Sequence, residues 1–324
     1  MACRKSLARM RNNFRFKSAR PLSRRCGVAI VAIVAIVLFG VSAPGYAASA
    51  EDSVGRYRDS LLADKNLPCR SNEACATAGV AALAAGHIEE ARKIVDTELA
   101  LAVADSITAD SDNAANSASA RIAIAQIHHG DIDAKSGNAA AARAWYHFAI
   151  EQQALALKSP VLSRVIAVAH ERLAALAGRN VVVRIPTTGA TFERYVALGA
   201  NNEISLVPVP GKPDTYTLSG SFTHPVVTQN GDLSANVGDL AATVRFFEGE
   251  ARVPVNPAQD GPIDATRRIA SLDKYSGADQ CLIEFQLGAA ETLRVRTRGS
   301  LGACGFGFNV DPDGTYYLTR TSVQ

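Results

Sequence analysis

The chain has 324 residues, of which 48% are hydrophobic and 20% are charged, with 34 Lys and Arg against 31 Asp and Glu. This length allows two domains of ordinary size, and the apolar content is enough to form their cores. Nine of the basic residues and no acidic residue lie within the first 25 positions, so the remainder is acidic, with 25 basic residues against 31 acidic ones. This balance excludes an electrostatic case for nucleic-acid binding.

The N-terminal segment has the order of a secretory signal. The basic stretch is followed by the apolar run Val28–Val41 and then by small residues up to Ala50. We therefore predict that residues 1–50 form a signal peptide cleaved near Ala50, which makes the mature protein periplasmic or secreted. The alternative is an uncleaved anchor over residues 27–43, whose length is at the lower limit for a membrane span. Any membrane contact would then be made through this segment only.

Four cysteines remain after the predicted cleavage. An exported chain with an even number of cysteines is expected to hold disulfides, although four cysteines allow three pairings. Their positions favour two local pairs, one in the first half of the mature chain and one near its end: Cys69 with Cys75, and Cys281 with Cys304. Neither spacing is typical of a zinc or thioredoxin-type site, so we expect no metal or cofactor at the cysteines.

Residues 51–178 have the character of a helical domain. Residues 51–66 predict a short helix, and Ser71 is a suitable N-cap for a second helix rich in small apolar residues. The polar segment Ser106–Ser117 predicts a loop. Near the end of this domain, Ser159 and Pro160 predict another helix start.

Two segments of this domain share one spacing of small residues. Each has a Gly, a second Gly seven residues later and an Ala five residues after that. The second copy adds an aromatic residue and another Ala, and its members are Gly130, Gly137, Ala142, Tyr146 and Ala149. In the first copy, which begins at Gly79, Val95 and Glu98 occupy the last two positions.

This spacing resembles the tetratricopeptide repeat, which implies an array of stacked helical hairpins. The two copies are 51 positions apart, whereas a regular array repeats about every 34 residues, and a generic helical bundle is the alternative. Ala142, Tyr146 and Ala149 lie on one helical face, and Trp145 lies on an adjoining face. We therefore predict that these four residues pack in the core, with the helix buried on both sides.

Four histidines of the helical domain were considered as metal ligands. His128, His129, His147 and His170 are the candidates, with Asp131 and Asp133 nearby. The preferred interpretation is that the first two lie in the last turn of a helix that ends at Gly130, where the helix dipole favours positive charge. The segment Asp131–Gly137 begins like a calcium loop, but Lys135 and Ser136 occupy positions that this loop cannot accept. We assign no metal or catalytic residue.

Residues 180–324 change to short segments rich in Val, Thr, Tyr and Phe, separated by turn residues. This pattern predicts an antiparallel β barrel or sandwich, so the overall class is α+β. Hairpin turns are expected at Phe246–Ala251 and Asp311–Tyr316. The predicted strands are 181–185, 191–197, 203–208, 214–219, 231–236, 242–247, 250–254, 280–287, 292–297, 304–309 and 315–320.

The end of the chain, from about residue 210, resembles a small secreted β module of exported proteins from Gram-negative bacteria. The resemblance rests on Cys281, Cys304, Gly305 and the Gly314-x-Tyr316 ending. Some of those proteins resemble lysozyme inhibitors. The resemblance implies a disulfide-closed β barrel and a protein ligand, and it identifies no inhibitory residue.

Three functions are compatible with these features. The first is a non-enzymatic periplasmic binding protein with a protein partner in the cell envelope, in which the helices form a scaffold and the β half a binding module. The second is an inhibitor of a cell-wall hydrolase such as lysozyme. The third is an envelope enzyme with a site between the two halves. The sequence contains no G-x-S-x-G or H-E-x-x-H motif, so the first function is preferred.

Overall fold

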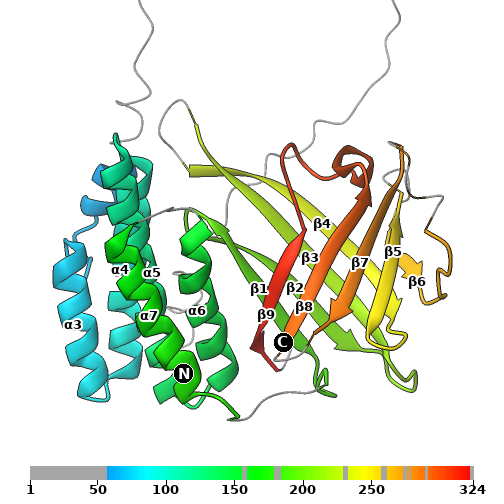
Figure 1. Ribbon diagram of the computed structural model, residues 1–324, viewed down its shortest axis with the longest axis horizontal. Helices are drawn as coiled ribbons and strands as arrows, with labels where there is room; N and C mark the ends of the chain where they lie inside the picture. The colour runs from blue at the N-terminus through cyan, green and yellow to red at the C-terminus, as the bar shows by residue number, and fades with distance from the viewer. Residues whose placement is uncertain are drawn as a thin grey trace, which may run out of the picture.

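The helices precede the strands along the chain and pack beside the sheet, so the protein has the predicted α+β class (Figure 1). The predicted signal peptide and residues 51–56 of the first predicted helix lie outside the described residues, and residues 57–62 of that helix are helical. The computed structural model describes residues 57–154, 159–178, 184–228, 233–256, 261–272, 275, 277, 279–288 and 291–321.

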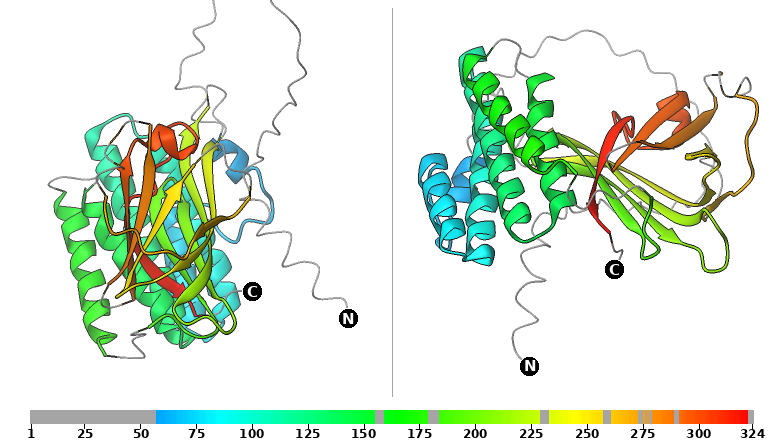
Figure 2. Two further views of the ribbon diagram at one scale, coloured as in Figure 1. Left: turned by 90° about the vertical axis from the view of Figure 1, so that its right-hand side faces the viewer. Right: turned by 60° about the horizontal axis from the view of Figure 1, so that its bottom comes forward.

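The helical region is an array of antiparallel pairs (Figures 1 and 2). The first pair joins α3 to α4, the second joins α5 to α6, and α7 packs against both helices of the second pair. None of the described helices combines the length and the apolar character needed to cross a bilayer. The bounds are α3 (Asn72–Ala84), α4 (Ile88–Ile107), α5 (Asp112–Lys135), α6 (Ala139–Glu151) and α7 (Pro160–Ala175).

Both predicted N-caps are confirmed. The Ser71 hydroxyl accepts a hydrogen bond from the backbone N–H of Ala74 at 3.2 Å, and the Ser159 hydroxyl accepts one from Leu162 at 3.3 Å. Ser111 caps α5 in the same way. This third cap corrects the prediction of a loop over Ser106–Ser117, because only four residues separate α4 from α5.

Helix α5 does not end at Gly130, so the prediction that His128 and His129 lie in a last turn is wrong. The helix continues to Lys135, so Gly130 lies inside it and not in a turn. A glycine is needed at this position because another helix packs closely against it. A Cβ atom at Gly130 would lie 2.3 Å from Cε1 of Tyr146 on α6. A Cβ at Gly79 on α3 would lie 3.0 Å from Cγ2 of Val95 on α4. The shared spacing therefore corresponds to the same close approach in both helical pairs.

In the described part of the chain, nine strands form one nearly closed barrel. The order is β5-β7-β8-β9-β1-β2-β3-β4-β6, and the two ends of this sheet, β5 and β6, lie beside each other. All neighbouring strands are antiparallel except β4 and β6, which are parallel. The bounds are β1 (Ala190–Ala197), β2 (Ala200–Pro208), β3 (Thr215–Val227), β4 (Leu233–Arg245), β5 (Glu250–Val255), β6 (Ile263–Ala265), β7 (Cys281–Leu287), β8 (Thr292–Gly299) and β9 (Gly314–Arg320).

Several predicted strands differ from this sheet. The described part of the predicted strand 231–236 and most of the predicted strand 242–247 fall within the single strand β4, and β6 was not predicted. The prediction of a strand at 304–309 is wrong, because Leu301–Cys304 is a short 3₁₀ helix and the residues that follow it form turns and irregular structure. Most of 181–185 lies outside the described residues.

One of the two predicted hairpin turns is confirmed. Phe247 and Glu250 exchange backbone hydrogen bonds of 2.7 and 3.0 Å around Glu248 and Gly249, which both have positive φ. The turn at Asp311–Tyr316 is wrong, since this segment is the end of a long connection from β8 to β9. Such errors arise where tertiary contacts, rather than local residue preferences, decide how the backbone runs.

The barrel core follows the alternation of strand side chains. Ile204 and Leu206 on β2 and Leu218 and Phe222 on β3 point inward and are buried. Gly220 is in the same row on β3, and a Cβ there would meet the Phe222 ring at 2.7 Å. The interior is therefore filled by side chains, as in other small barrels.

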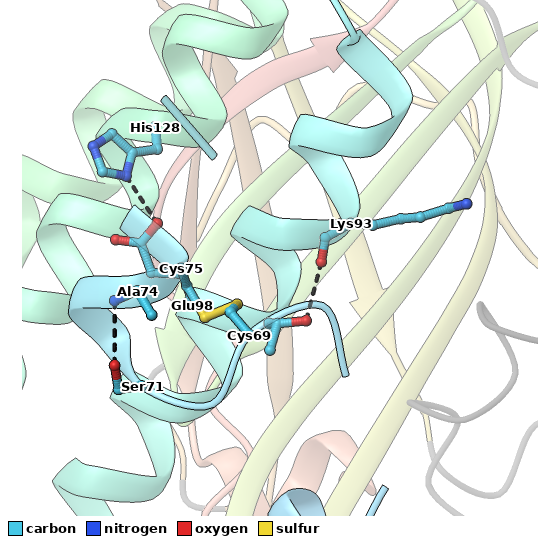
Figure 3. Close-up of a disulfide and its surroundings, with 8 residues drawn as sticks. Cys69, Ser71, Ala74, Cys75, Lys93, Glu98 and His128 are labelled. Atoms are coloured by element: carbon cyan, nitrogen blue, oxygen red, sulfur yellow. Dashed lines mark hydrogen bonds and ion pairs between the residues drawn. A yellow bond between two sulfur atoms is a disulfide. The ribbon is translucent and has the colours of Figure 1, made fainter. Parts of the chain in front are cut away.

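Both disulfides have the local pairing that the cysteine positions favoured. Cys281 bonds to Cys304 within the barrel, and Cys69 bonds to Cys75, which ties the segment before α3 to that helix. Figure 3 shows the bridge between Cys69 and Cys75 near the ion pair between Glu98 and His128. Disulfides persist in oxidising compartments, so these two bridges indicate an extracytoplasmic location.

The close contact at Gly130 predicts the effect of a single methyl group. Gly130→Ala should lower the free energy of unfolding by about 1–3 kcal/mol, because the added Cβ overlaps the buried Tyr146 ring. Urea unfolding of the oxidised protein measures this change. Gly302→Ala is the control, since a Cβ there meets nothing closer than 3.5 Å. Equal stability of Gly130→Ala and wild type would contradict the packing argument.

Candidate functional site

Helix α6 is the element on which the two halves meet. Ala142, Tyr146 and Ala149 face α5 and α7 and are fully or almost fully buried. On another side, Ala144 and Phe148 pack with Tyr195 of β1. Trp145, the fourth predicted packing residue, is partly buried at the edge of that second cluster. This helix therefore contacts other elements on both sides.

A polar stripe of α6 faces the barrel. The stripe consists of Arg143, His147 and Glu151, which recur every four residues and so share one helical face. Arg143 forms a buried ion pair with Glu291, with a nitrogen–oxygen distance of 2.5 Å. The Tyr317 hydroxyl of β9 donates a hydrogen bond of 2.9 Å to Glu151, and the His147 ring stacks on Tyr317 with centroids 4.3 Å apart.

Burial changes the proton affinity of these interface groups. Burial, together with smaller Coulombic contributions from His170 and Arg143, lowers the pKa of His147 to about 4. Burial also raises the pKa of Glu151, although the hydrogen bond from Tyr317 opposes this change. His147 is therefore neutral near pH 7. Because these side chains contact Glu291 and Tyr317 of the barrel half, they fix the helices to the barrel.

The histidines considered as metal ligands have different partners. Nδ1 of His128 lies 2.8 Å from a carboxylate oxygen of Glu98. The His129 ring stacks on Trp145 with centroids 4.3 Å apart, and burial lowers its pKa to about 3. Within the described ranges, no group of three or more His, Cys, Asp or Glu side chains has the proximity needed to hold a metal ion.

A surface groove lies between α3, α5 and the end of α7, with one lining residue from α6. Its volume is about 410 Å³. Its lining is mostly apolar and includes Val80, an exposed residue of α3 with 51% of its surface accessible. The complete lining is Val80, Leu83, Ala84, Asp131, Ala134, Lys135, Tyr146, Arg172, Ala175 and Leu176.

The charged residues of this groove are held by defined contacts. Asp131 accepts a hydrogen bond of 2.7 Å from the Tyr146 hydroxyl and pairs with Arg172 at 2.9 Å. The Lys135 ammonium donates to the backbone carbonyls of Leu83 and Ala84 at the end of α3. Lys135 therefore links the two helical pairs while its positive charge stays at the groove. Both Asp131 and Lys135 belong to the segment that begins like a calcium loop, and they lie in α5 instead.

The sequence did not predict this groove, because its lining comes from four helices. The spacing of Gly79 and Gly130 was the available signal, since it indicated that α3 and α5 occupy equivalent positions in two pairs. It did not indicate how far apart the pairs lie. That distance depends on contacts such as the one between Lys135 and α3.

A second exposed feature is the connection between β8 and β9. Phe308 in this connection is 80% exposed, and its carbonyl accepts a hydrogen bond of 2.8 Å from the Asn236 side chain. Phe306 packs on Phe222, with ring centroids 5.3 Å apart. The prediction that Gly305–Gly307 forms part of a strand is wrong, because Gly305 ends a 3₁₀ helix with φ of 73°. The connection thus presents one large apolar side chain from a fixed backbone.

The lowered pKa of His147 predicts a pH effect on stability. An unfolded histidine has a pKa of about 6.5, so the unfolded state binds more protons between pH 6.5 and about 4. The contribution of His147 is therefore complete above this window and is lost as the pH falls through it. His147→Phe keeps a ring against Tyr317 and removes the titration.

Urea unfolding of wild type and His147→Phe at about pH 7 and about pH 4.5 tests this prediction. Wild type should lose on the order of 2 kcal/mol more stability than the variant, a value reduced for partial exposure. Buried carboxylates with raised pKa act in the opposite direction, but they are common to both proteins and cancel in the difference. Parallel pH profiles would show that His147 keeps its ordinary pKa.

Comparison with known proteins identifies no family. None of the protein-family models, curated proteins or solved structures compared with this chain matches it.

Proposed function

We propose that the mature chain is a non-enzymatic binding protein of the bacterial cell envelope and that the groove between α3, α5 and α7 holds a segment of a partner protein. The observation that carries this proposal is the groove itself, which has a volume of about 410 Å³, a mostly apolar lining and cationic side chains at its edge. Small apolar pockets with a few polar groups are the usual form of a binding site.

The repeated close contacts of the helices support a tetratricopeptide-like array as the scaffold. Gly79 with Val95 and Gly130 with Tyr146 are equivalent pairs. The groove is lined mainly by the first helix of each pair, so adjacent units contribute to one continuous surface. Stacked repeats commonly form extended binding surfaces in this manner.

The charges of the groove favour an acidic partner segment with at least one apolar side chain. Val80, Leu83 and Ala134 offer the apolar contact. Asp131 is already paired with Arg172, whereas the Lys135 ammonium is bonded only to neutral carbonyl groups among the described residues. A carboxylate of the partner near Lys135 would neutralise the positive charge of its ammonium group.

The proposed location is the periplasm after cleavage near Ala50. The signal-like order of residues 1–50 supports export. The mature chain then carries 25 basic and 31 acidic residues, which favours solubility in the envelope over binding to an acidic polymer.

A matched pair of variants tests the groove. The mature protein is immobilised and envelope proteins are captured from an extract, then quantified individually by mass spectrometry. Val80→Lys should abolish capture of the specific partner, because it puts a charged side chain on the apolar surface of the groove. Val161→Lys should retain it, since Val161 has similar exposure, 49%, but does not line the groove.

Two results would contradict the proposal. One is equal capture by both variants, which would assign binding to another surface. The other is turnover of an envelope substrate that a single point mutation abolishes, which would make the protein an enzyme. Thermal unfolding of both variants checks that they remain folded.

The second candidate function is inhibition of a cell-wall hydrolase such as lysozyme. Phe308 favours it, since an exposed aromatic residue on a fixed backbone is typical of the residues that dominate protein–protein affinity. The disulfide between Cys281 and Cys304 holds the start of this connection against β7. The site would therefore be formed before the enzyme binds, which reduces the entropic cost of association.

A lysozyme activity assay with the full mature protein tests this second function. Inhibition at micromolar concentration is expected for wild type, and Phe308→Ala should weaken it about tenfold or more, as loss of a buried aromatic anchor does. Val237→Ala is the control, because Val237 is a moderately exposed residue on the adjacent strand. Absence of inhibition by the wild-type protein removes this function.

A further inference from the structure

A second cavity lies at the seam of the barrel, remote from the helical region. It has a volume of about 70 Å³, and its lining comes from the end of β4, the turn that follows it, β5 and the segment after β6. Figure 1 shows β5 and β6 on the side of the barrel away from the helices. Four of its seven lining residues are arginines. The lining consists of Arg245, Phe247, Glu250, Arg252, Arg267, Arg268 and Ile269.

Arg252 is the fixed member of this arginine cluster. Its guanidinium pairs with Glu284 at 3.2 Å and donates a hydrogen bond of 2.6 Å to the carbonyl of Ile269. It also lies 3.4 Å from Glu250. These contacts join β5, β7 and the segment after β6, so they hold the walls of the cavity in place.

The other three arginines are less strongly neutralised. Arg268 pairs with Glu248 at 3.6 Å, but both side chains are largely exposed, so the pair contributes little. Arg245 lies over the Phe247 ring, with 5.1 Å between its Cζ and the ring centroid. Stacking orients a guanidinium and leaves its N–H edge available for an acceptor.

Arg267, in the segment after β6, is the fourth arginine that lines the cavity. Its side chain is exposed and interacts electrostatically with Asp264, but among the described residues no carboxylate comes within 4.0 Å ion-pair distance of Arg245 or Arg267. Four guanidinium groups and one lining carboxylate therefore surround a small space. The lining therefore carries a net positive charge, which favours an anion in this space.

We propose that this cavity binds a phosphate group. A tetrahedral oxyanion offers acceptors in several directions, which suits guanidinium groups that converge from three chain segments. The volume suits one such group rather than a whole nucleotide. The phosphate can belong to a free ion, a soluble monoester or the diester of a lipid headgroup, because all three carry negatively charged non-bridging oxygens.

Isothermal titration calorimetry of the mature protein with inorganic phosphate, at constant ionic strength against chloride, tests the proposal. We expect one site. Arg267→Gln should weaken binding about tenfold or more, the loss expected for one charge-assisted hydrogen bond. Arg267→Lys should give an intermediate loss, because it keeps the charge and loses the fork of donors.

Arg294→Gln is the matched control, since Arg294 is an exposed arginine on β8 and does not line the cavity. It should bind phosphate as wild type does. Equal weakening by Arg267→Gln and Arg294→Gln would overturn the proposal, because affinity would then follow net charge alone. Absence of phosphate binding by wild type, in this and in the following experiments, would overturn it as well.

Two further arms identify the source of the phosphate. Glycerol phosphate replaces inorganic phosphate in the titration, and tighter binding that depends on Arg267 assigns the site to a monoester. Vesicles of phosphatidylcholine with and without phosphatidylglycerol are then used in co-sedimentation. Binding that requires the anionic lipid and is lost in Arg267→Gln assigns the site to a headgroup. Circular dichroism and thermal unfolding confirm that each variant is folded.

Discussion

The burial of α6 is the constraint on which the rest of the structure depends. This helix packs against α5 and α7 through Tyr146 and against the barrel through Phe148. Its polar stripe adds the buried ion pair between Arg143 and Glu291. Removing one partner of a buried pair costs about 3–5 kcal/mol, so this contact penalises any arrangement in which the helix leaves the barrel.

Such an interface makes the polar groups between the halves structural. The third function considered, an enzyme with a site between the two halves, requires titratable groups to meet there, and Arg143, His147 and Glu151 do meet there. Each of them, however, is engaged with a group of the barrel. The neutral state of His147 follows from the same burial. A general acid or base must lie within hydrogen-bond reach of its substrate. The contacts of these three side chains in the structure are with residues of the barrel half.

The exposed features lie away from this interface, in both halves. The groove is built on the helical array, whereas Phe308 and the arginine cluster belong to the barrel and its connections. They also differ in chemistry, since the groove is mainly apolar, Phe308 is a single large apolar residue and the cluster is cationic. The experiments on Val80, Phe308 and Arg267 therefore address each surface independently.

The sequence by itself determined the α+β class, the caps at Ser71 and Ser159, the local disulfide pairs and the burial of Tyr146. Each depends on residues close together in the chain or on a regular period. Only the tertiary structure decided that α5 continues past Gly130, that β4 is one long strand, and that β6 pairs in parallel with it. The groove and the arginine cluster also required it, because Lys135 meets α3, and Arg245 and Arg267 line one cavity from different segments of the chain. Contacts between distant segments leave no periodic pattern in the sequence, since their geometry depends on the packing of every element between them.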